Sequence, residues 1–336
     1  MLNLLWLQSG GCGGCTMSLL NAESPDLITT LEAAGINLLW HPSLSEESGS
    51  EVISILQQII DGDLGLDILC IEGSMLMGPA GTGRFHLMGG TGRPMIDWVT
   101  DLAAKSRYTV AVGSCAAYGG ISAAGENITE ATGLQYDGEL PGGLLGEEYR
   151  SAGAASVINI SGCPTHPNWV TETLLQLALD EFSEDSVDPL GRPRNYADHL
   201  VHHGCSRNEY YEYKASAEHP GEQGCMMENM GCLGTQAHAD CNIRPWNGEG
   251  SCTRGGYACI NCTAPEFEEP AFAFTKTRKI AGIPVGLPTD MPKAWFVALA
   301  SLSKAATPER LRSNAVSERI IYPPGDLSNH HKNKKS

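Results

Sequence analysis

Residues 1–16 read MLNLLWLQSGGCGGCT, and this stretch decides the fold. An apolar run of strand length, Leu2 to Gln8, ends in a glycine-rich turn, and a helix-like segment from Thr16 to Asn21 follows. A buried strand that leads through such a turn into a helix is typical of a parallel α/β sheet. The turn also holds Cys12 and Cys15, so the end of the first predicted strand is the first candidate site.

The same alternation of apolar runs and helical patterns continues to about residue 180. We predict further strands at 36–40, 66–71, 109–113 and 157–160, and helices at 25–34, 46–60, 95–105 and 168–179. Strands that alternate with helices in this way predict an α/β class and a flavodoxin-like N-terminal domain with a parallel sheet.

The domain limits follow from changes in composition. Residues 1–183 are assigned to the flavodoxin-like domain, and the acidic stretch 181–194, which contains Pro and Gly, resembles a linker. Residues 184–270 hold seven cysteines with little periodicity, so we expect an irregular cluster-binding domain that is ordered by its metals. Residues 271–336 form a C-terminal extension with a helix near 291–300 and a polar tail.

Composition excludes several classes of function. The 336 residues include 22 Lys and Arg against 39 Asp and Glu, a formal net charge of −17 that disfavours nucleic acid as a partner. No apolar run is long enough for a membrane helix, and no basic leader is seen, so we expect a cytoplasmic protein. Twelve cysteines in that compartment favour metal ligation over disulfides. No Walker A or dinucleotide-binding motif is present.

Cysteines follow three of the predicted strands. Cys12 and Cys15 follow the first, Cys115 the fourth and Cys163 the fifth. The carboxyl ends of parallel strands share one sheet edge, where the positive end of the helix near Thr16 would also point. Four converging thiolates favour a [4Fe-4S] cluster, whereas a redox disulfide between the first two would leave the others unexplained.

Two further sets lie beyond residue 200. One has the spacing C-x10-C-x6-C-x2-C and consists of Cys241, Cys252, Cys259 and Cys262. That spacing suits zinc and iron–sulfur about equally well. The other consists of Cys205, Cys225 and Cys232, for which His202, His203 or His199 could be the fourth ligand. Cys70 remains, inside an apolar strand, and is interpreted as a buried free thiol.

Together these motifs resemble the small subunit of [NiFe] hydrogenases over residues 2 to about 265. The segments that resemble it most are LWLQ at 5–8, GCGGCT at 11–16, EG at 72–73, GSC at 113–115, GCPTHP at 162–167 and the later cysteine blocks. The resemblance implies an electron-relay chain of a hydrogen:acceptor oxidoreductase, with a NiFe(CN)2CO centre in a separate large subunit.

The resemblance also implies three clusters. The proximal [4Fe-4S] cluster would have the ligands Cys12, Cys15, Cys115 and Cys163, and the distal [4Fe-4S] cluster His202, Cys205, Cys225 and Cys232. The medial cluster would have Cys241, Cys259 and Cys262. Many members have proline in place of Cys252 and hold [3Fe-4S] there. The extra thiolate predicts a medial [4Fe-4S] cluster of lower potential.

Within that family, the sequence is most similar to cytosolic hydrogen-sensing regulatory hydrogenases, notably at 8–15, 41–49, 252–259 and 292–300. Such a sensor would signal to a histidine kinase through the Trp295 helix or the tail, and two heterodimers could associate. The alternative is a cytoplasmic uptake enzyme that feeds a quinone or another carrier. A one-cluster quinone-reductase subunit or a zinc-stabilised structural protein would leave many of the cysteines unexplained.

Glu72 is the one candidate for proton transfer. A carboxylate at a strand end beside the proximal set could relay protons at the subunit contact. The alternative is a structural hydrogen bond to nearby backbone N–H groups, which we favour.

Overall fold

The computed structural model describes residues 1–269, 276–284, 287 and 292–322. It divides into two compact units. The N-terminal unit comprises Met1–His199, Trp246–Gly248 and Cys262–Ala271, and the C-terminal unit comprises Leu200–Pro245, Glu249–Asn261 and Phe272–Ser336. Each unit is described by itself.

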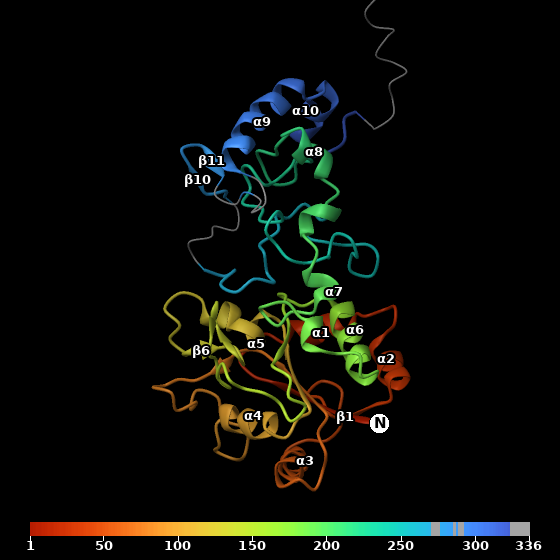
Figure 1. Ribbon diagram of the computed structural model, residues 1–336, viewed down its shortest axis with the longest axis vertical. Helices are drawn as coiled ribbons and strands as arrows, with labels where there is room; N and C mark the ends of the chain where they lie inside the picture. Colours follow the sequence, from red (N-terminus) through yellow and green to blue (C-terminus); the bar gives the residue numbers. More distant parts are fainter. Residues whose placement is uncertain (270–275, 285–286, 288–291, 323–336) are drawn as a thin grey trace, which may run out of the picture. The chain divides into compact units, whose positions relative to one another are not determined.

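A five-stranded parallel sheet is the centre of the N-terminal unit (Figure 1). Its strands are β1 (Leu2–Gln8), β2 (Ile36–Trp40), β3 (Ile68–Glu72), β5 (Tyr108–Val112) and β9 (Ile158–Ile160), in the spatial order β2-β1-β3-β5-β9. Counting these five strands alone, the order is 2-1-3-4-5, which is that of flavodoxin-like folds. The predicted fold class is confirmed.

The register aligns the ends of four strands. Gln8 at the end of β1 pairs with Glu72 of β3, which pairs with Val112 of β5, which in turn pairs with Ile160 of β9. The chain therefore leaves these four strands at one level of the sheet, and the segments that follow them start side by side.

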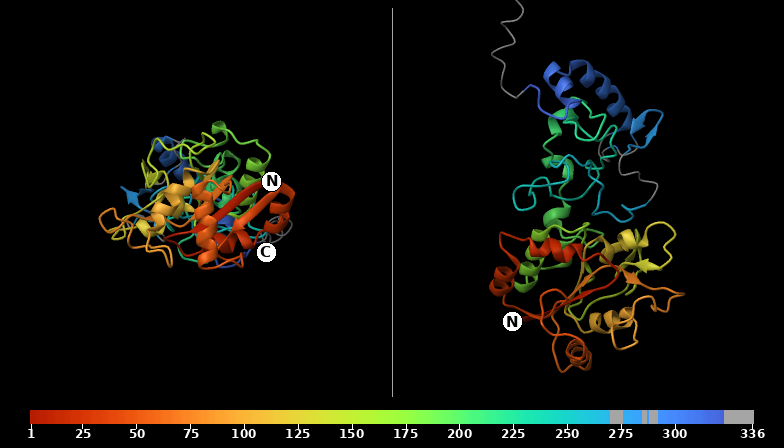
Figure 2. Two further views of the ribbon diagram at one scale, coloured as in Figure 1. Left: turned by 90° about the horizontal axis from the view of Figure 1, so that it is seen from below. Right: turned by 180° about the vertical axis from the view of Figure 1, so that it is seen from behind.

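Helices cover both faces of the sheet (Figure 2). The helices α1 (Gly14–Leu20), α2 (Leu27–Ala34) and α6 (Pro167–Ala178) contact one another, and α3 (Ser50–Asp61) contacts α4 (Met95–Ala103). Helix α2 has clear end signals, because the Asp26 side chain accepts a hydrogen bond from the backbone N–H of Thr29, and Gly35 follows with a φ of 62°.

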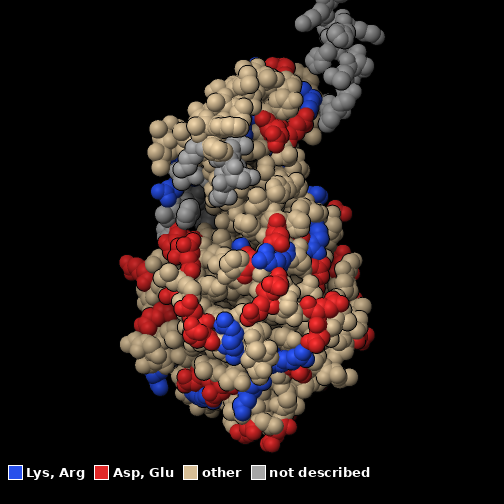
Figure 3. All heavy atoms as spheres, in the orientation of Figure 1, with Lys and Arg blue, Asp and Glu red and all other residues tan. Residues whose placement is uncertain are grey.

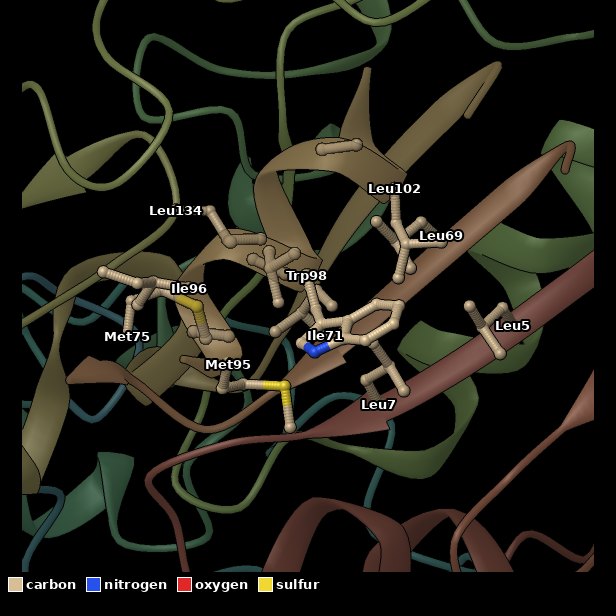
Figure 4. Packing of buried hydrophobic residues seen from close by; sticks show 14 of the residues in the cluster. Leu5, Leu7, Leu69, Ile71, Met75, Met95, Ile96, Trp98, Leu102 and Leu134 are labelled. Carbon is tan, nitrogen blue, oxygen red and sulfur yellow. The ribbon is translucent and has the colours of Figure 1, made fainter. Parts of the chain in front are cut away.

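The apolar core lies between the sheet and α3 and α4 (Figure 4). Leu69 and Ile71 of β3 are fully buried there, with Trp98 and Leu102 of α4. Cys70 lies between the two β3 residues in sequence and is also fully buried as a free thiol, as predicted. Burial raises the pKa of this thiol and keeps it unreactive.

The shorter elements lie in the connections. They are β4 (Met75–Leu76), α5 (Ser114–Tyr118), β6 (Ala131–Thr132), β7 (Tyr136–Asp137), β8 (Leu140–Pro141) and α7 (Arg194–Ala197), with 3-10 turns at Gly120–Ala123, Glu184–Ser186 and Val201–Gly204. Helix α5 was not predicted, because five residues are too few to show a helical period.

The first domain extends beyond residue 183, where the sequence predicts its end. Residues 184–199, which the sequence suggested were partly linker, pack on the N-terminal unit. The ring of Tyr196 stacks on Trp169 at a centroid distance of 4.0 Å, and its hydroxyl donates to the carbonyl of Asn159. Arg192 forms a buried ion pair with Asp188 at 2.6 Å. These contacts hold the acidic stretch in place, so it is not a linker.

The C-terminal unit contains α8 (Asn208–Glu212), the hairpin β10 (Lys279–Ile280) and β11 (Ile283–Pro284), α9 (Lys293–Ala306) and α10 (Glu309–Ala315). Its described apolar clusters are small: one is Tyr211, Met227, Leu287 and Phe296, and the other is Ala215, Leu311 and Ala315. Each cluster joins the cysteine-rich segment to residues beyond 272. The predicted divisions 184–270 and 271–336 therefore do not coincide with this unit.

The predicted helix at 291–300 is present as α9, which begins after Pro292. Phe296 is buried, whereas Trp295 is 66% and Leu302 67% exposed. The polar tail from residue 323 lies outside the described residues.

Acidic side chains are spread over the visible surface, in keeping with the net charge (Figure 3). Among the described helices, none has both the length and the apolar character needed to cross a membrane.

Candidate metal centres

The aligned strand ends place the four cysteines of the predicted proximal set. Cys12 and Cys15 lie between β1 and α1, Cys115 lies in the first turn of α5 directly after β5, and Cys163 follows β9. Because these strands end at one level, the cysteines come together although they are up to 151 positions apart in sequence.

The electrostatics of these thiols show how close they are. Burial raises the pKa of Cys163 to about 12, and the neighbouring thiols of Cys115, Cys262 and Cys12 add to the shift. Burial also raises the pKa of Cys15, to which Glu72, Cys115 and Cys163 contribute. A metal cation offsets such repulsion and deprotonates the thiols that bind it. The donor set therefore fits a cationic, thiolate-bound group.

Two glycines make room for the sulfur atoms. Gly113 has a φ of 88°, and a β-carbon there would overlap the Sγ of Cys15. A β-carbon on Gly120 would lie 2.9 Å from the Sγ of Cys115. Any other residue would push these thiols out of position.

Glu72 lies beside this set at the end of β3 and is 3% exposed. Its Oε1 accepts from the backbone N–H groups of Cys15 and Thr16, both at 3.0 Å. Its Oε2 accepts from Gln8 at 3.0 Å, from the Trp6 indole at 3.3 Å and from the Thr16 hydroxyl. The carboxylate thus joins β3 to the start of α1.

The hydrogen bonds of Glu72 change the prediction that the positive end of the helix near Thr16 points at the cysteines. The N–H groups of Cys15 and Thr16 in the first turn of α1 donate to Glu72, so they are not free to face the thiols. The carboxylate satisfies them in the way an acidic residue stabilises a helix start.

Cys262 belongs to the N-terminal unit, whereas the other members of the predicted medial set, Cys241, Cys252 and Cys259, belong to the C-terminal unit. The carbonyl of Cys262 accepts from the hydroxyl of Ser114 at 2.5 Å, and its thiol is coupled to Cys163. This member of the predicted medial set is therefore anchored beside the predicted proximal set.

The predicted distal set surrounds one cavity of the C-terminal unit. His202, Cys205, Cys225 and Cys232 all line it. Burial raises the pKa of Cys225 to about 12, and the thiols of Cys232 and Cys205 add to the shift. His202 lies in this cavity wall, whereas His203 does not, and His199 belongs to the other unit. Of the three histidines that the spacing left open, His202 is therefore the one that lines this cavity.

Arg207 is a functional candidate that the sequence analysis missed. It is 8% exposed and lines the distal cavity. Its Nη1 donates to the carbonyls of Glu222 and Gly224 at 2.6 and 2.7 Å, and its Nε donates to that of Thr253 at 3.1 Å. These three acceptors are uncharged, so the positive charge of Arg207 acts on the cavity and opposes the rise that burial causes in the pKa of Cys232. The only feature of the sequence that could have indicated this role is the position of the arginine, two residues after Cys205.

In the C-terminal unit, cysteines of the predicted distal and medial sets contact each other. The backbone N–H of Cys259 donates to the Sγ of Cys232 at 3.4 Å, and the N–H of Leu233 donates to the carbonyl of Cys259 at 2.8 Å. Asn242 fixes the loop between Cys241 and Cys252, because its Oδ1 accepts from the Thr253 hydroxyl at 2.8 Å.

Glu268 was also missed. It is 8% exposed, one of its oxygens has no hydrogen-bond partner among the described residues, and burial raises its pKa. The negative charge of its carboxylate raises the pKa of Cys115 and Cys163.

Among the described residues, no three His, Cys, Asp or Glu side chains are arranged to hold a single metal ion.

Two family models match this chain. Residues 12–177 match the 20 kDa subunit of NADH ubiquinone oxidoreductase, and residues 197–275 match the C-terminal domain of NiFe/NiFeSe hydrogenase small subunits.

The chain is similar to curated hydrogenase small subunits. It is 34% identical over 306 residues to the F420 non-reducing hydrogenase II small subunit of Methanosarcina mazei, covering 83% of this chain and 77% of that one. It is 33% identical over 282 residues to the periplasmic [NiFeSe] hydrogenase small subunit of Desulfomicrobium baculatum, covering 79% and 84%.

Solved structures give the same result. An actinobacterial-type NiFe-hydrogenase from Ralstonia eutropha H16 matches with a TM-score of 0.74 at 27% identity, covering 96% of this chain and 95% of that one. A [NiFeSe]-hydrogenase from Dm. baculatum matches with a TM-score of 0.70 at 30% identity, covering 82% and 99%.

Proposed function

Since this chain belongs to the small subunits of [NiFe] hydrogenases, we propose that it relays electrons through three iron–sulfur clusters in a cytosolic hydrogen sensor. As a small subunit, it is the electron-transfer partner of a NiFe large subunit. The observation that carries this proposal is the pair of cysteine sets, one at the aligned strand ends and one around the cavity of the C-terminal unit.

We assign the ligands as the sequence predicts. The proximal [4Fe-4S] cluster would be held by Cys12, Cys15, Cys115 and Cys163, the medial one by Cys241, Cys252, Cys259 and Cys262, and the distal one by His202, Cys205, Cys225 and Cys232. When bound, such clusters supply reversible one-electron chemistry.

The protein's own residues control that chemistry. Burial makes the thiols costly to ionise without iron, so the sites favour a cationic group. His202 is neutral where a cysteine would be anionic, and Arg207 adds a positive charge to the same cavity. Both raise the potential of a group bound there, which favours electron flow toward the distal site.

Cys252 decides the type of medial cluster. It is exposed and lies in the loop that Asn242 fixes. A fourth thiolate would retain a fourth iron and lower the potential relative to [3Fe-4S]. In a Cys252→Ala variant, one iron per chain should be lost while sulfide stays constant. A Cys70→Ala variant is the matched control, since that thiol is no ligand candidate.

The relay is tested with the complex of the two subunits. Hydrogen should reduce the clusters, seen as a loss of visible absorbance, only when the large subunit is present. A wild-type complex with full cluster content that hydrogen does not reduce would contradict the relay.

The sensing role rests on sequence similarity and needs its own test. Addition of hydrogen should change the autophosphorylation of a histidine kinase that binds the complex, and the Trp295→Glu variant should weaken that binding, because Trp295 is exposed on α9. Kinase binding that survives deletion of residues 280–336 would remove this role from the C-terminal segment.

The second candidate is an uptake enzyme that feeds a quinone or another carrier. Relatives include the quinone-reactive Ni/Fe-hydrogenase small chain of Wolinella succinogenes, 27% identical over 273 residues. Rapid turnover with a physiological carrier and no kinase response would favour it. Fractionation of native cells tests the cytoplasmic location, and the mass of the purified complex tests a dimer of heterodimers.

Glu72 can be tested as a proton relay. Its two oxygens already accept five hydrogen bonds, which supports an anchoring role. A Glu72→Gln complex should exchange H2 with D2O at the wild-type rate per loaded active site. A strong decrease at unchanged cluster content would favour proton transfer.

A further inference from the structure

The C-terminal unit has a second cavity, next to the distal one. It has a volume of about 240 Å³. Tyr211, Cys225 and Met227 line both cavities, so they form the wall between them. A molecule in the second cavity would therefore lie against a proposed ligand of the distal cluster.

Lys214 brings a positively charged group to this cavity, and the carboxylates of Glu212 and Glu228 act on it through space without a direct ion pair among the described residues. Its Nζ lies 3.6 Å from the ring centroid of Tyr211 and 4.7 Å from that of Phe296. Among the described residues it has no carboxylate partner. The residue also has a φ of 53°, a conformation that lysine rarely adopts.

The other charged groups in the wall neutralise each other. Lys304 pairs with Glu228 at 2.7 Å, and Glu228 also accepts from the hydroxyl of Ser216 at 2.7 Å. The remaining wall is largely apolar and includes Ile283, from the β10–β11 hairpin, and Ala300 of α9. In the part of its wall that the structure describes, the cavity thus combines apolar side chains with a lysine that forms no ion pair.

We propose that this cavity binds the electron acceptor of the complex, and that the acceptor is a quinone-type conjugated ring whose carbonyl oxygen accepts a hydrogen bond from Lys214. The inference rests on the proposed electron relay and deepens the second candidate function, the uptake enzyme. Apolar walls suit the ring, and a nearby cation stabilises the negative charge that a carbonyl oxygen gains on reduction. The volume of about 240 Å³ lies below the range of roughly 300–1,000 Å³ that sites for drug-sized ligands have, which limits the occupant to a small ring system and excludes a dinucleotide.

The overall reaction balances without another reactant. Oxidation of one H2 at the large subunit releases two protons and two electrons. The quinone takes up two electrons and two protons, and its two carbonyls become the two hydroxyls of a quinol.

The test compares two acceptors on the intact complex. Menadione offers the ring and carbonyls, whereas benzyl viologen is a dication without carbonyls. In Lys214→Gln, the ratio of menadione-linked to viologen-linked kcat/KM should fall at least tenfold, mainly through KM for menadione. Lys214→Arg keeps the charge and should restore at least half of the ratio, and Ala300→Phe, which fills the cavity, should lower it.

The control is Lys279→Gln, which removes an exposed lysine of the same unit outside the cavity and should leave the ratio unchanged. Equilibrium dialysis of menadione against wild type and Lys214→Gln measures binding without turnover. Wild-type affinity and ratio in both Lys214→Gln and Ala300→Phe would overturn the proposal. Failure of the relay itself would differ, since viologen reduction would then be absent while dialysis still reports on the cavity.

Discussion

The N-terminal unit buries a continuous core between its sheet and its helices, whereas the C-terminal unit has two small apolar clusters among its described residues. The cysteines differ in the same way. Those of the proximal set are placed by aligned strands, and those of the distal set by turns and single hydrogen bonds. The sheet can therefore form before metal binds, while the C-terminal unit needs its clusters for order.

Cluster removal should separate the two units most clearly. After anaerobic chelation of iron, amide hydrogen exchange should become fast over residues 200–261, while β1, β3 and β5 stay protected by their ladders and core. The measurement is exchange followed by mass spectrometry, with the loaded complex as control. Equal loss of protection in the sheet would contradict the difference between the units.

Core truncation is the next largest effect. Leu69→Ala removes a fully buried side chain of β3 and should lower the free energy of unfolding by about 2–5 kcal/mol. Leu299→Ala is the matched control, because the Leu299 side chain on α9 is 47% exposed. It should change the free energy of unfolding by less than about 0.5 kcal/mol. Denaturant unfolding of both variants measures the difference. A similar loss of stability in both variants would mean that the Leu299 side chain packs tightly against the rest of its unit.

Acid should destabilise the N-terminal unit through His41. Burial lowers its pKa to about 4, and its Nδ1 accepts from the N–H of Ser43. Between the ordinary pKa of about 6.5 and this value, the unfolded chain binds a proton that the folded chain does not. Stability should therefore fall as the pH drops through this window, by up to roughly 3 kcal/mol. Urea unfolding of wild type against His41→Asn measures this, and an identical pH slope would exclude His41 as the cause.

Arg207 should give a smaller effect that is specific to the C-terminal unit. Arg207→Gln leaves up to three buried carbonyls without their donor, which costs about 1–3 kcal/mol. It also removes a cation from the distal cavity, so the distal midpoint potential should fall while the proximal one stays. Redox titration followed by electron paramagnetic resonance measures both. An unchanged distal potential would leave Arg207 with a structural role alone.

The sequence predicts the two units unequally well. The β1 and β2 limits are the same as predicted, because buried strands show uninterrupted apolar runs and the turns after them contain glycine. The convergence of Cys12 with Cys163 also follows from parallel strands alone. Gly120 could not be predicted as a spacer for Cys115, since that contact exists only in the folded chain.

In the C-terminal unit, periodicity gives little information. His202 could not be chosen over His203 from spacing, because which of them lines the cavity depends on the 3-10 turn at 201–204. Arg207, Glu268 and Lys214 were missed for the same reason, since a charged residue in a loop is usually solvated, and only packing shows that these three are buried or enclosed.

If this chain holds three four-iron clusters, metal analysis of the anaerobically purified small subunit will show them. Iron, acid-labile sulfide and zinc are measured per chain. We expect about 12 irons with an equal amount of sulfide, four of each per cluster, and no stoichiometric zinc. About 11 irons with unchanged sulfide would remove Cys252 from the ligands, and zinc in place of iron would contradict the electron relay.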